Sequence, residues 1–275
     1  MKESVLTGHH FVNGINVYYE FYPNENEKTV VLLHGFLSST FTFRHLIPLL
    51  NRDFQVLSID LPPFGRSDKS KRFIYSYQNL ARTVIQIIDY FGIKEPVLIG
   101  HSMGGQVVLN ILHLMPEFAE KVVLLSSSSY LKRQKWTLRM FSYFPFSHLF
   151  VKRWLAKTGI VKNLEETLYN HSLINNEMIE GYLQPFLQNK IFNALTRMIR
   201  DWEGDLPSHV LNQIKSKCLL IWGEHDLSQP LHVGERLKND LAHSELVVLE
   251  ETGHAIPEEK PLEIYESIKK FLKEG

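Results

Sequence analysis

Residues 97–106 begin as an apolar run and end as a cluster of glycines around one serine: Val97-Leu98-Ile99-Gly100-His101-Ser102-Met103-Gly104-Gly105-Gln106. The apolar run predicts a short buried strand, and the residues from Gly104 to Met115 predict a helix. A Gly-x-Ser-x-Gly motif between a strand and a helix holds its serine in a tight, strained turn and lifts the hydroxyl above the sheet. We interpret Ser102 as a candidate nucleophile. The alternative is a solvated serine in a glycine-rich turn.

A serine hydroxyl is a poor nucleophile without a general base, and position must select that base among 13 histidines. His254 follows the predicted strand Leu246 to Leu249 and precedes a helix. Such a loop lies at the carboxyl edge of a parallel sheet, where the active sites of α/β proteins form. His254 is therefore the candidate base, with an ordinary surface histidine as the alternative.

The base in turn needs an acid that holds its tautomer and stabilises the imidazolium. Asp226 closes the segment Trp222-Gly223-Glu224-His225-Asp226, directly after the predicted strand Leu219 to Trp222. It could instead be a turn or capping aspartate, and Glu224 is a nearby competitor. We prefer Asp226 because the chain order Ser102, Asp226, His254 is the order that accompanies this motif.

A tetrahedral intermediate also needs donors for its developing oxyanion. His34-Gly35-Phe36 follows the predicted strand Val30 to Leu33. The backbone N–H groups of Phe36 and Met103 are the natural pair of donors, whereas His34 is expected to be a structural hydrogen-bonding residue.

Short apolar runs alternate with helical segments along most of the chain, which predicts a mainly parallel sheet covered on both faces. Asn13-Gly14 between two strand-like runs predicts an antiparallel hairpin at the start. Residues 130–207 contain no convincing strand and are rich in aromatic residues and helical periodicity. We therefore expect a core of residues 1–129 and 208–275 with a helical cap, residues 130–207, inserted into it.

Composition excludes several classes of function. The 30 basic and 30 acidic residues balance, which gives no indication of a nucleic-acid partner. No metal-binding His-Glu-x-x-His motif, dinucleotide fingerprint or phosphate loop occurs, so no metal or cofactor is expected. The single cysteine, Cys218, lies in an apolar run and is expected to be a buried thiol. No signal-peptide core or membrane-length apolar run is present, which favours a cytoplasmic protein.

Taken together, these segments resemble the α/β-hydrolase superfamily over nearly the whole chain. The segments that carry the resemblance, in the family's order, are His34-Gly35-Phe36, Asp60-Leu61-Pro62, Gly65-Arg66-Ser67, Gly100 to Gly105, Trp222 to Asp226 and Gly253-His254. The pattern is most similar to the capped branch with carboxylesterases, small-glyceride lipases, carbon–carbon bond hydrolases and haloperoxidase-like enzymes. Pro63 departs from the glycine common there, and we expect a stiffened loop with the chemistry intact.

The resemblance implies a serine hydrolase that acts on a small-molecule carboxylic ester through an acyl-enzyme. Relatives that cleave epoxides or carbon–halogen bonds carry an aspartate at the position of Ser102, so these reactions are not expected. Two other interpretations stay open: a hydrolase of a carbon–carbon bond or lactone, and a ligand-sensing receptor with very slow turnover. The sequence does not indicate the natural substrate or the oligomeric state.

The first part of the expected cap is basic and aromatic. Residues 130–162 include eight lysines and arginines and no acidic residue, together with aromatic residues such as Trp136 and Phe144. One interpretation is that the rings pack on the core and the charges are solvated. The other is that Trp136 and Phe144 line an acyl pocket over Ser102, while the basic face makes weak contact with an anionic membrane surface.

Overall fold

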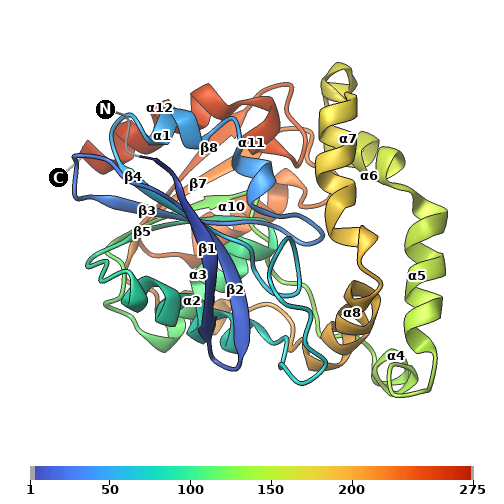
Figure 1. The fold of residues 1–275 in the computed structure, drawn as a ribbon. Helices are drawn as coiled ribbons and strands as arrows, with labels where there is room; N and C mark the ends of the chain where they lie inside the picture. The colour runs from blue at the N-terminus through green and yellow to red at the C-terminus, as the bar shows by residue number, and fades with distance from the viewer. Residues whose placement is uncertain (1–3, 274–275) are drawn as a thin grey trace.

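The computed structural model describes residues 4–273, which form one eight-stranded sheet with helices on both faces (Figure 1). The strand order is β1-β2-β4-β3-β5-β6-β7-β8. Strand β2 runs antiparallel to both of its neighbours, and all the other strands except β1, that is β3 to β8, are parallel to one another. The strands are β1 Leu6–Val12, β2 Ile15–Tyr22, β3 Thr29–Leu33, β4 Gln55–Ile59, β5 Val97–His101, β6 Lys121–Leu125, β7 Lys217–Gly223 and β8 Ser244–Leu249. The predicted mostly parallel sheet is thus confirmed.

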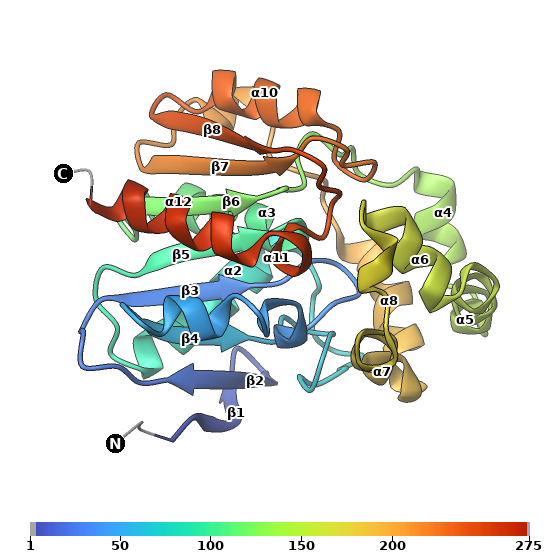
Figure 2. The ribbon, with the colours of Figure 1, turned by 90° about the horizontal axis from the view of Figure 1, so that it is seen from above.

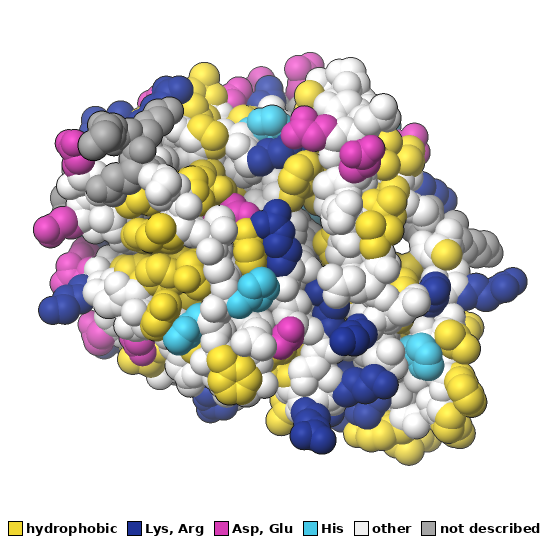
Figure 3. Space-filling model, viewed as in Figure 1, with side chains coloured by type: hydrophobic (Ala, Val, Ile, Leu, Met, Phe, Trp, Pro, Cys, Tyr) yellow, Lys and Arg dark blue, Asp and Glu magenta, His cyan; other side chains and the backbone are white. Residues whose placement is uncertain are grey.

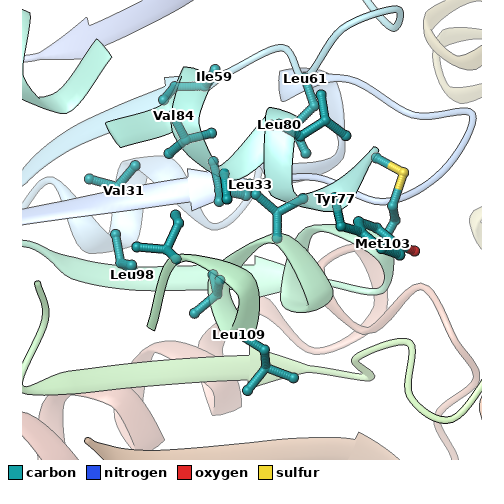
Figure 4. Close-up of a cluster of buried hydrophobic side chains, with 14 of the residues drawn as sticks. Val31, Leu33, Ile59, Leu61, Tyr77, Leu80, Val84, Leu98, Met103 and Leu109 are labelled. Carbon is teal, nitrogen blue, oxygen red and sulfur yellow. The ribbon is translucent and has the colours of Figure 1, made fainter. Parts of the chain in front are cut away.

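Side chains along the parallel strands alternate between two hydrophobic clusters, as the two-residue period of a strand requires. In β3, Val31 and Leu33 pack on one face, whereas Val30 and Leu32 pack on the other. The first face is covered by α2 Tyr77–Tyr90 and α3 Met103–Leu114, and Figure 4 shows Leu80, Val84 and Leu109 of these helices against the sheet. Because both faces are buried, these strands appear in the sequence as continuous apolar runs.

The remaining core helices complete the two layers. The first face also carries α9 Ser208–Leu211 and α10 Leu231–Asp240. The second face carries α1 Ile47–Leu50, α11 Ile256–Glu259 and α12 Pro261–Lys273, together with the short 3₁₀ helix η1 Thr40–Phe43. Cys218 lies buried in β7, and burial raises the pKa of its thiol to about 12, which leaves it protonated.

Local signals set the helix and turn boundaries. Helix α2 begins at Tyr77, because the Ser76 hydroxyl accepts a hydrogen bond from the Asn79 N–H and caps the helix. The helix ends before Gly92, which adopts a positive φ of 64°. The hairpin between β1 and β2 turns at Asn13 and Gly14, both with positive φ, as a two-residue turn of this type requires.

Residues 130–207, between β6 and α9, form helices and no strand in the part of the chain that the structure describes. These are α4 Trp136–Phe141, α5 Ser147–Thr158, α6 Ile160–Thr167, η2 His171–Leu173, α7 Asn176–Leu183, η3 Gln184–Leu187 and α8 Lys190–Asp201. We call residues 130–207 the helical insertion. Figure 2 shows that it lies beyond the carboxyl ends of the parallel strands, and that α4 and α5 are its outermost helices. Among the described residues, no helix is long and apolar enough to cross a membrane.

Candidate active site

Ser102 sits at the turn between β5 and α3, with φ 51° and ψ −117°. A positive φ is strained for a residue with a side chain, and such strain concentrates at functional sites. The flanking glycines are required by packing. A Cβ on Gly104 would lie 2.1 Å from the carbonyl oxygen of Leu33, and one on Gly100 would lie 2.5 Å from that of Gly104. The motif therefore lets α3 begin directly against the end of β3 while the serine stays at the carboxyl edge of the sheet.

His254 and Asp226 meet at the same edge from two other strands. The Nδ1 atom of His254 lies 2.8 Å from Oδ2 of Asp226, and both residues are buried. The other carboxylate oxygen, Oδ1, accepts the backbone N–H groups of Ser228 at 2.8 Å and Gln229 at 2.7 Å. Since a carboxylate can only accept, Nδ1 of His254 carries its proton and Nε2 is left as an acceptor.

Glu224, the competing acid, does not take part in this contact. Its side chain is exposed, and its Oε2 accepts the backbone N–H of Glu251 at 3.3 Å. The difference follows from the turn after β7. The Asp226 carboxylate is buried and accepts backbone N–H groups of its own loop, whereas the Glu224 side chain is exposed to solvent.

Two further histidines at this edge are buried. His34 accepts the N–H of Leu61 at Nε2, 2.9 Å away, and its Nδ1 lies 2.7 Å from the carbonyl oxygen of Gly35, so it joins the loops after β3 and β4. His101 lies 2.9 Å from the carbonyl oxygen of His254 through its Nε2. Burial lowers the pKa of His34 to about 4 and that of His101 to about 3, which keeps both rings neutral.

His101 was missed by the sequence interpretation, although it lies inside the serine motif. A carbonyl oxygen only accepts, so the His101 proton is on Nε2 and holds the loop of His254. The other ring nitrogen, Nδ1, is buried with no hydrogen-bond partner among the described residues.

Gly35, the residue before Phe36, lies against Ser102. A Cβ on Gly35 would lie 3.1 Å from Cβ of Ser102, so the backbone that precedes Phe36 passes directly over the serine. Met103 follows Ser102 as the first residue of α3, where a backbone N–H has no carbonyl within the helix. Both amides thus belong to segments that meet at the serine.

A cavity with about 490 Å³ of empty space, part of it open to solvent, joins these groups. It is lined by Ser102 and His254 together with Phe36 and Leu37 of the core. From the helical insertion it is lined by α6, α7 and the turn after α6, through Asn163, Leu164, Thr167, Leu168, Met178 and Tyr182.

Trp136 and Phe144 do not line this cavity, contrary to the second of the two interpretations drawn from the sequence. Both rings lie on the outer part of the insertion, 72% and 64% exposed. The aromatic pattern of residues 130–162 belongs mainly to α4, α5 and the turn between them, which do not line the cavity. The part of the insertion that lines the cavity is α6, α7 and the turn after α6, which contribute both apolar and polar side chains. The pattern of these two helices is that of any amphipathic helix.

One end of the cavity is polar. Glu258 is buried there, and its Oε1 contacts the guanidinium of Arg44 and, at 2.9 Å, the hydroxyl of Tyr182. Tyr182 is also 2.9 Å from the Thr42 hydroxyl. Burial raises the pKa of Glu258, against the opposing effect of Arg44. These contacts fix α7 to the core beside the cavity.

The helical insertion also contacts the loop of His254 directly. The carbonyl oxygen of Thr167 accepts the N–H groups of His254 at 2.7 Å and Ala255 at 3.0 Å. Glu259 bridges the same parts: Oε2 accepts the N–H of Gly253 at 2.8 Å, and Oε1 accepts those of Tyr169 at 3.0 Å and Asn170 at 2.9 Å. Neither contact has a sequence signal, because both depend on backbone groups brought together by the fold.

The described residues contain no cluster of three or more histidine, cysteine, aspartate or glutamate side chains that could hold a metal ion. The candidate site thus combines a strained serine and a histidine at a cavity with an aspartate that contacts the histidine.

Comparison with known proteins agrees with this architecture. The sequence profile of the α/β hydrolase fold matches residues 28–261. The chain belongs to the α/β-hydrolase fold family. This hydrolase is 50% identical over 262 residues to the uncharacterized hydrolase YugF of Bacillus subtilis, covering 95% of this chain and 96% of that one.

A more distant relative is named for its substrate. The chain is 26% identical over 253 residues to a 2-hydroxy-6-oxononadienedioate/2-hydroxy-6-oxononatrienedioate hydrolase of Pseudomonas putida, covering 87% of this hydrolase and 86% of that one. The fold of the present chain is similar to that of a serine hydrolase from the polyaromatic-hydrocarbon-degrading bacterium Cycloclasticus zankles. The TM-score is 0.80 at 19% identity, and the match covers 98% of each chain.

Proposed function

We propose that this hydrolase cleaves carboxylic esters through an acyl-enzyme, with Ser102 as nucleophile, His254 as general base and Asp226 as its orienting acid. The observation that carries the proposal is the 2.8 Å contact between His254 Nδ1 and Asp226 Oδ2 beside a serine held at φ 51° in the same cavity. The contact leaves His254 Nε2 free to accept the proton of Ser102.

In the proposed reaction, Ser102 Oγ forms a bond to the ester carbonyl carbon while its proton passes to His254 Nε2. The amides of Phe36 and Met103 donate to the resulting oxyanion. Collapse breaks the bond to the alcohol oxygen, which takes the proton from His254. Water then attacks the acyl-enzyme by the same route, giving the carboxylic acid and free Ser102.

The character of the cavity favours a neutral ester over a dicarboxylate. Among the described residues that line it there is no lysine or arginine, and the only ionisable carboxyl is Glu258, whose Arg44 partner is already engaged. A substrate carboxylate would therefore find no free cation. For this reason we rank ester hydrolysis above the cleavage of a carbon–carbon bond in a dicarboxylate, the substrate type named for the Pseudomonas relative.

The test uses a panel of p-nitrophenyl esters with acyl chains from acetate to octanoate, together with a lactone, an epoxide and a dienedioate. We expect turnover of the esters, loss of nearly all of it in Ser102→Ala, and labelling of Ser102 alone by a fluorophosphonate. Ser267→Ala is the matched control, because that hydroxyl only contacts the Glu263 carbonyl on the surface of α12.

Three results would contradict the proposal. Undiminished ester turnover in Ser102→Ala would exclude this nucleophile, and cleavage of the dienedioate alone would establish the carbon–carbon alternative. A single stoichiometric burst without further turnover would indicate the ligand-sensing alternative.

A further inference from the structure

The outer helices of the insertion expose large apolar side chains to an unusual degree. The exposed rings include Trp136 at 72%, Phe144 at 64%, Phe146 at 73% and Phe150 at 61%. Helix α4 has no buried residue at all. Figure 3 shows hydrophobic side chains gathered over α4 and the adjoining end of α5, beside lysine and arginine side chains. Single exposed apolar residues are ordinary on a protein surface, but a contiguous group indicates an interaction site.

The exposed rings of α5 are additional to the apolar face that this helix packs against the core. Val151 and Leu155 already pack against the main hydrophobic cluster and form the inner face of α5. Phe150 and Trp154, on the rest of that helix, are exposed. A helix at a protein–water boundary is expected to be polar on its outer face, whereas α5 also exposes large rings there, next to Lys152 and Arg153. The outer face of α4 and α5, with the turn between them, thus needs an apolar partner.

The charge of the same segment identifies the partner. Residues 130–162 carry eight basic residues and no acidic one. Lys132, Arg133, Lys135 and Arg153 are exposed, while the side chain of Lys157 lies outside the described residues. A second copy docked face to face would bring like charges together, which is unfavourable. Aromatic rings flanked by lysine and arginine match a lipid surface whose headgroups are anionic.

We propose that the outer face of α4 and α5, residues 131–154, binds the surface of an anionic lipid bilayer. The rings of Trp136, Phe144 and Phe146 enter the boundary between headgroups and acyl chains, and the basic side chains contact the phosphates. Phe146 is suited to this, since it occupies a left-handed turn with φ 65° between the two helices and its ring projects outward. Binding holds the protein as a peripheral protein and requires no spanning helix.

The proposed surface is connected to the cavity. Helix α5 leads directly into α6, whose residues Asn163 and Leu164 line the wall over Ser102. Membrane contact at α4 and α5 therefore brings the cavity close to substrates dissolved in the bilayer. The proposal does not depend on ester hydrolysis, because lipid binding needs no reaction at Ser102.

The experiment is co-sedimentation of the full chain with vesicles of phosphatidylcholine alone or of phosphatidylcholine and phosphatidylglycerol in equal parts. We expect preferential binding to the anionic vesicles. Raising the ionic strength from about 0.01 M to about 0.15 M should weaken it severalfold, because the Debye length falls from about 30 Å to about 8 Å. The fluorescence of exposed Trp136 should shift to the blue on binding, whereas Trp222 is already buried.

Matched variants separate the two contributions. Phe144→Ser with Phe146→Ser should abolish binding at both salt concentrations, and Lys132→Glu with Lys135→Glu should abolish the preference for anionic vesicles. The controls are Leu262→Ser on α12 and Lys94→Glu after α2. Both side chains are exposed outside the proposed surface, so these variants should bind as the unaltered chain does. Ser102→Ala should also bind normally, which keeps this test separate from that of the proposed reaction.

Two results would overturn the proposal. Equal, negligible binding to both kinds of vesicle would exclude a lipid surface. Concentration-dependent dimerisation that disappears in the Phe144→Ser, Phe146→Ser variant, without vesicle binding, would make the same surface an interface between two copies.

Discussion

At the scale of single residues, the hydrogen bonds of Asp226 determine what His254 can do. Oδ1 of Asp226 is occupied by two backbone N–H groups, which leaves only Oδ2 for His254. The carboxylate is therefore fixed in one orientation, and it fixes the proton of His254 on Nδ1. The chain order was enough to predict that these two side chains meet, because each follows a strand whose carboxyl end lies at the same edge of the sheet.

Asp226→Asn is expected to lower kcat/KM for a p-nitrophenyl ester by about 10⁴-fold, the loss that a wrong tautomer causes in serine proteases. The backbone N–H groups of Ser228 and Gln229 require an oxygen at Oδ1, so the asparagine would present its NH₂ group to His254. Nδ1 would then become an acceptor and Nε2 would carry the proton, which prevents it from taking the proton of Ser102. Steady-state kinetics and circular dichroism of the folded variant would test this.

Glu224→Gln is the control for that substitution, since the Glu224 side chain is exposed and contacts the Glu251 N–H and the neighbouring His225 ring, not His254. It should leave kcat/KM almost unchanged. A larger loss in Glu224→Gln than in Asp226→Asn would mean that the acid has been assigned to the wrong residue.

At the scale of elements, the helical insertion and the loop before α11 act as one unit. Glu259, the last residue of α11, accepts one N–H from the loop of His254 and two from the segment after α6. The carbonyl of Thr167 adds two more hydrogen bonds between the same parts. A shift of α6 would therefore move His254 relative to Ser102.

Glu259→Gln should lower kcat by about 10- to 100-fold with a smaller change in KM, the effect expected when a catalytic group is displaced by about 1 Å. A carboxylate can accept from both sides, whereas glutamine would turn an NH₂ group toward one set of N–H donors. We also expect a loss of about 1–3 kcal/mol in the free energy of unfolding. Kinetics and urea unfolding on the same samples would measure both.

Glu263→Gln is the matched control, because this exposed carboxylate makes only a 3.9 Å surface contact with Lys260. It should change neither quantity appreciably. If Glu259→Gln lowers stability while kcat stays the same, the residue is structural and does not position His254.

The same elements show where sequence-based prediction succeeded and where it could not. The strands were predictable because their apolar runs are buried on both faces, and Asn13-Gly14 specified the hairpin. The roles of Glu259 and Tyr182 were not predictable, because they arise from contacts between segments distant in sequence. The position of Trp136 and Phe144 was not predictable either. The aromatic composition of their segment is consistent with a pocket over Ser102, but the fold places both rings on the outer surface.

At the scale of the whole molecule, the carboxyl edge of the sheet buries several ionisable groups whose effects on stability oppose one another. Burial lowers the pKa of His34 to about 4 and that of His101 to about 3, so their contribution to stability is lost as the pH falls below about 6.5. Burial raises the pKa of Asp60 to about 6, despite its hydrogen bonds from the Thr40 and Arg66 amides. That carboxyl favours the folded state at low pH and this contribution is lost as the pH rises through about 6.

His34→Gln isolates one of these contributions. The folded pKa of His34, about 4, lies below its unfolded value of 6.5, so between these values the unfolded chain binds more protons and acid destabilises the fold. The residue should remove about 1.4 kcal/mol of stability per pH unit over that window. Glutamine does not titrate, so the difference in unfolding free energy, unaltered chain minus variant, should decrease steadily from pH 6.5 to pH 4.5, whatever its value at pH 7. His101 and Asp60 are present in both proteins and cancel. Urea unfolding at several pH values measures this difference, and parallel stability curves would show that His34 is not held neutral by burial.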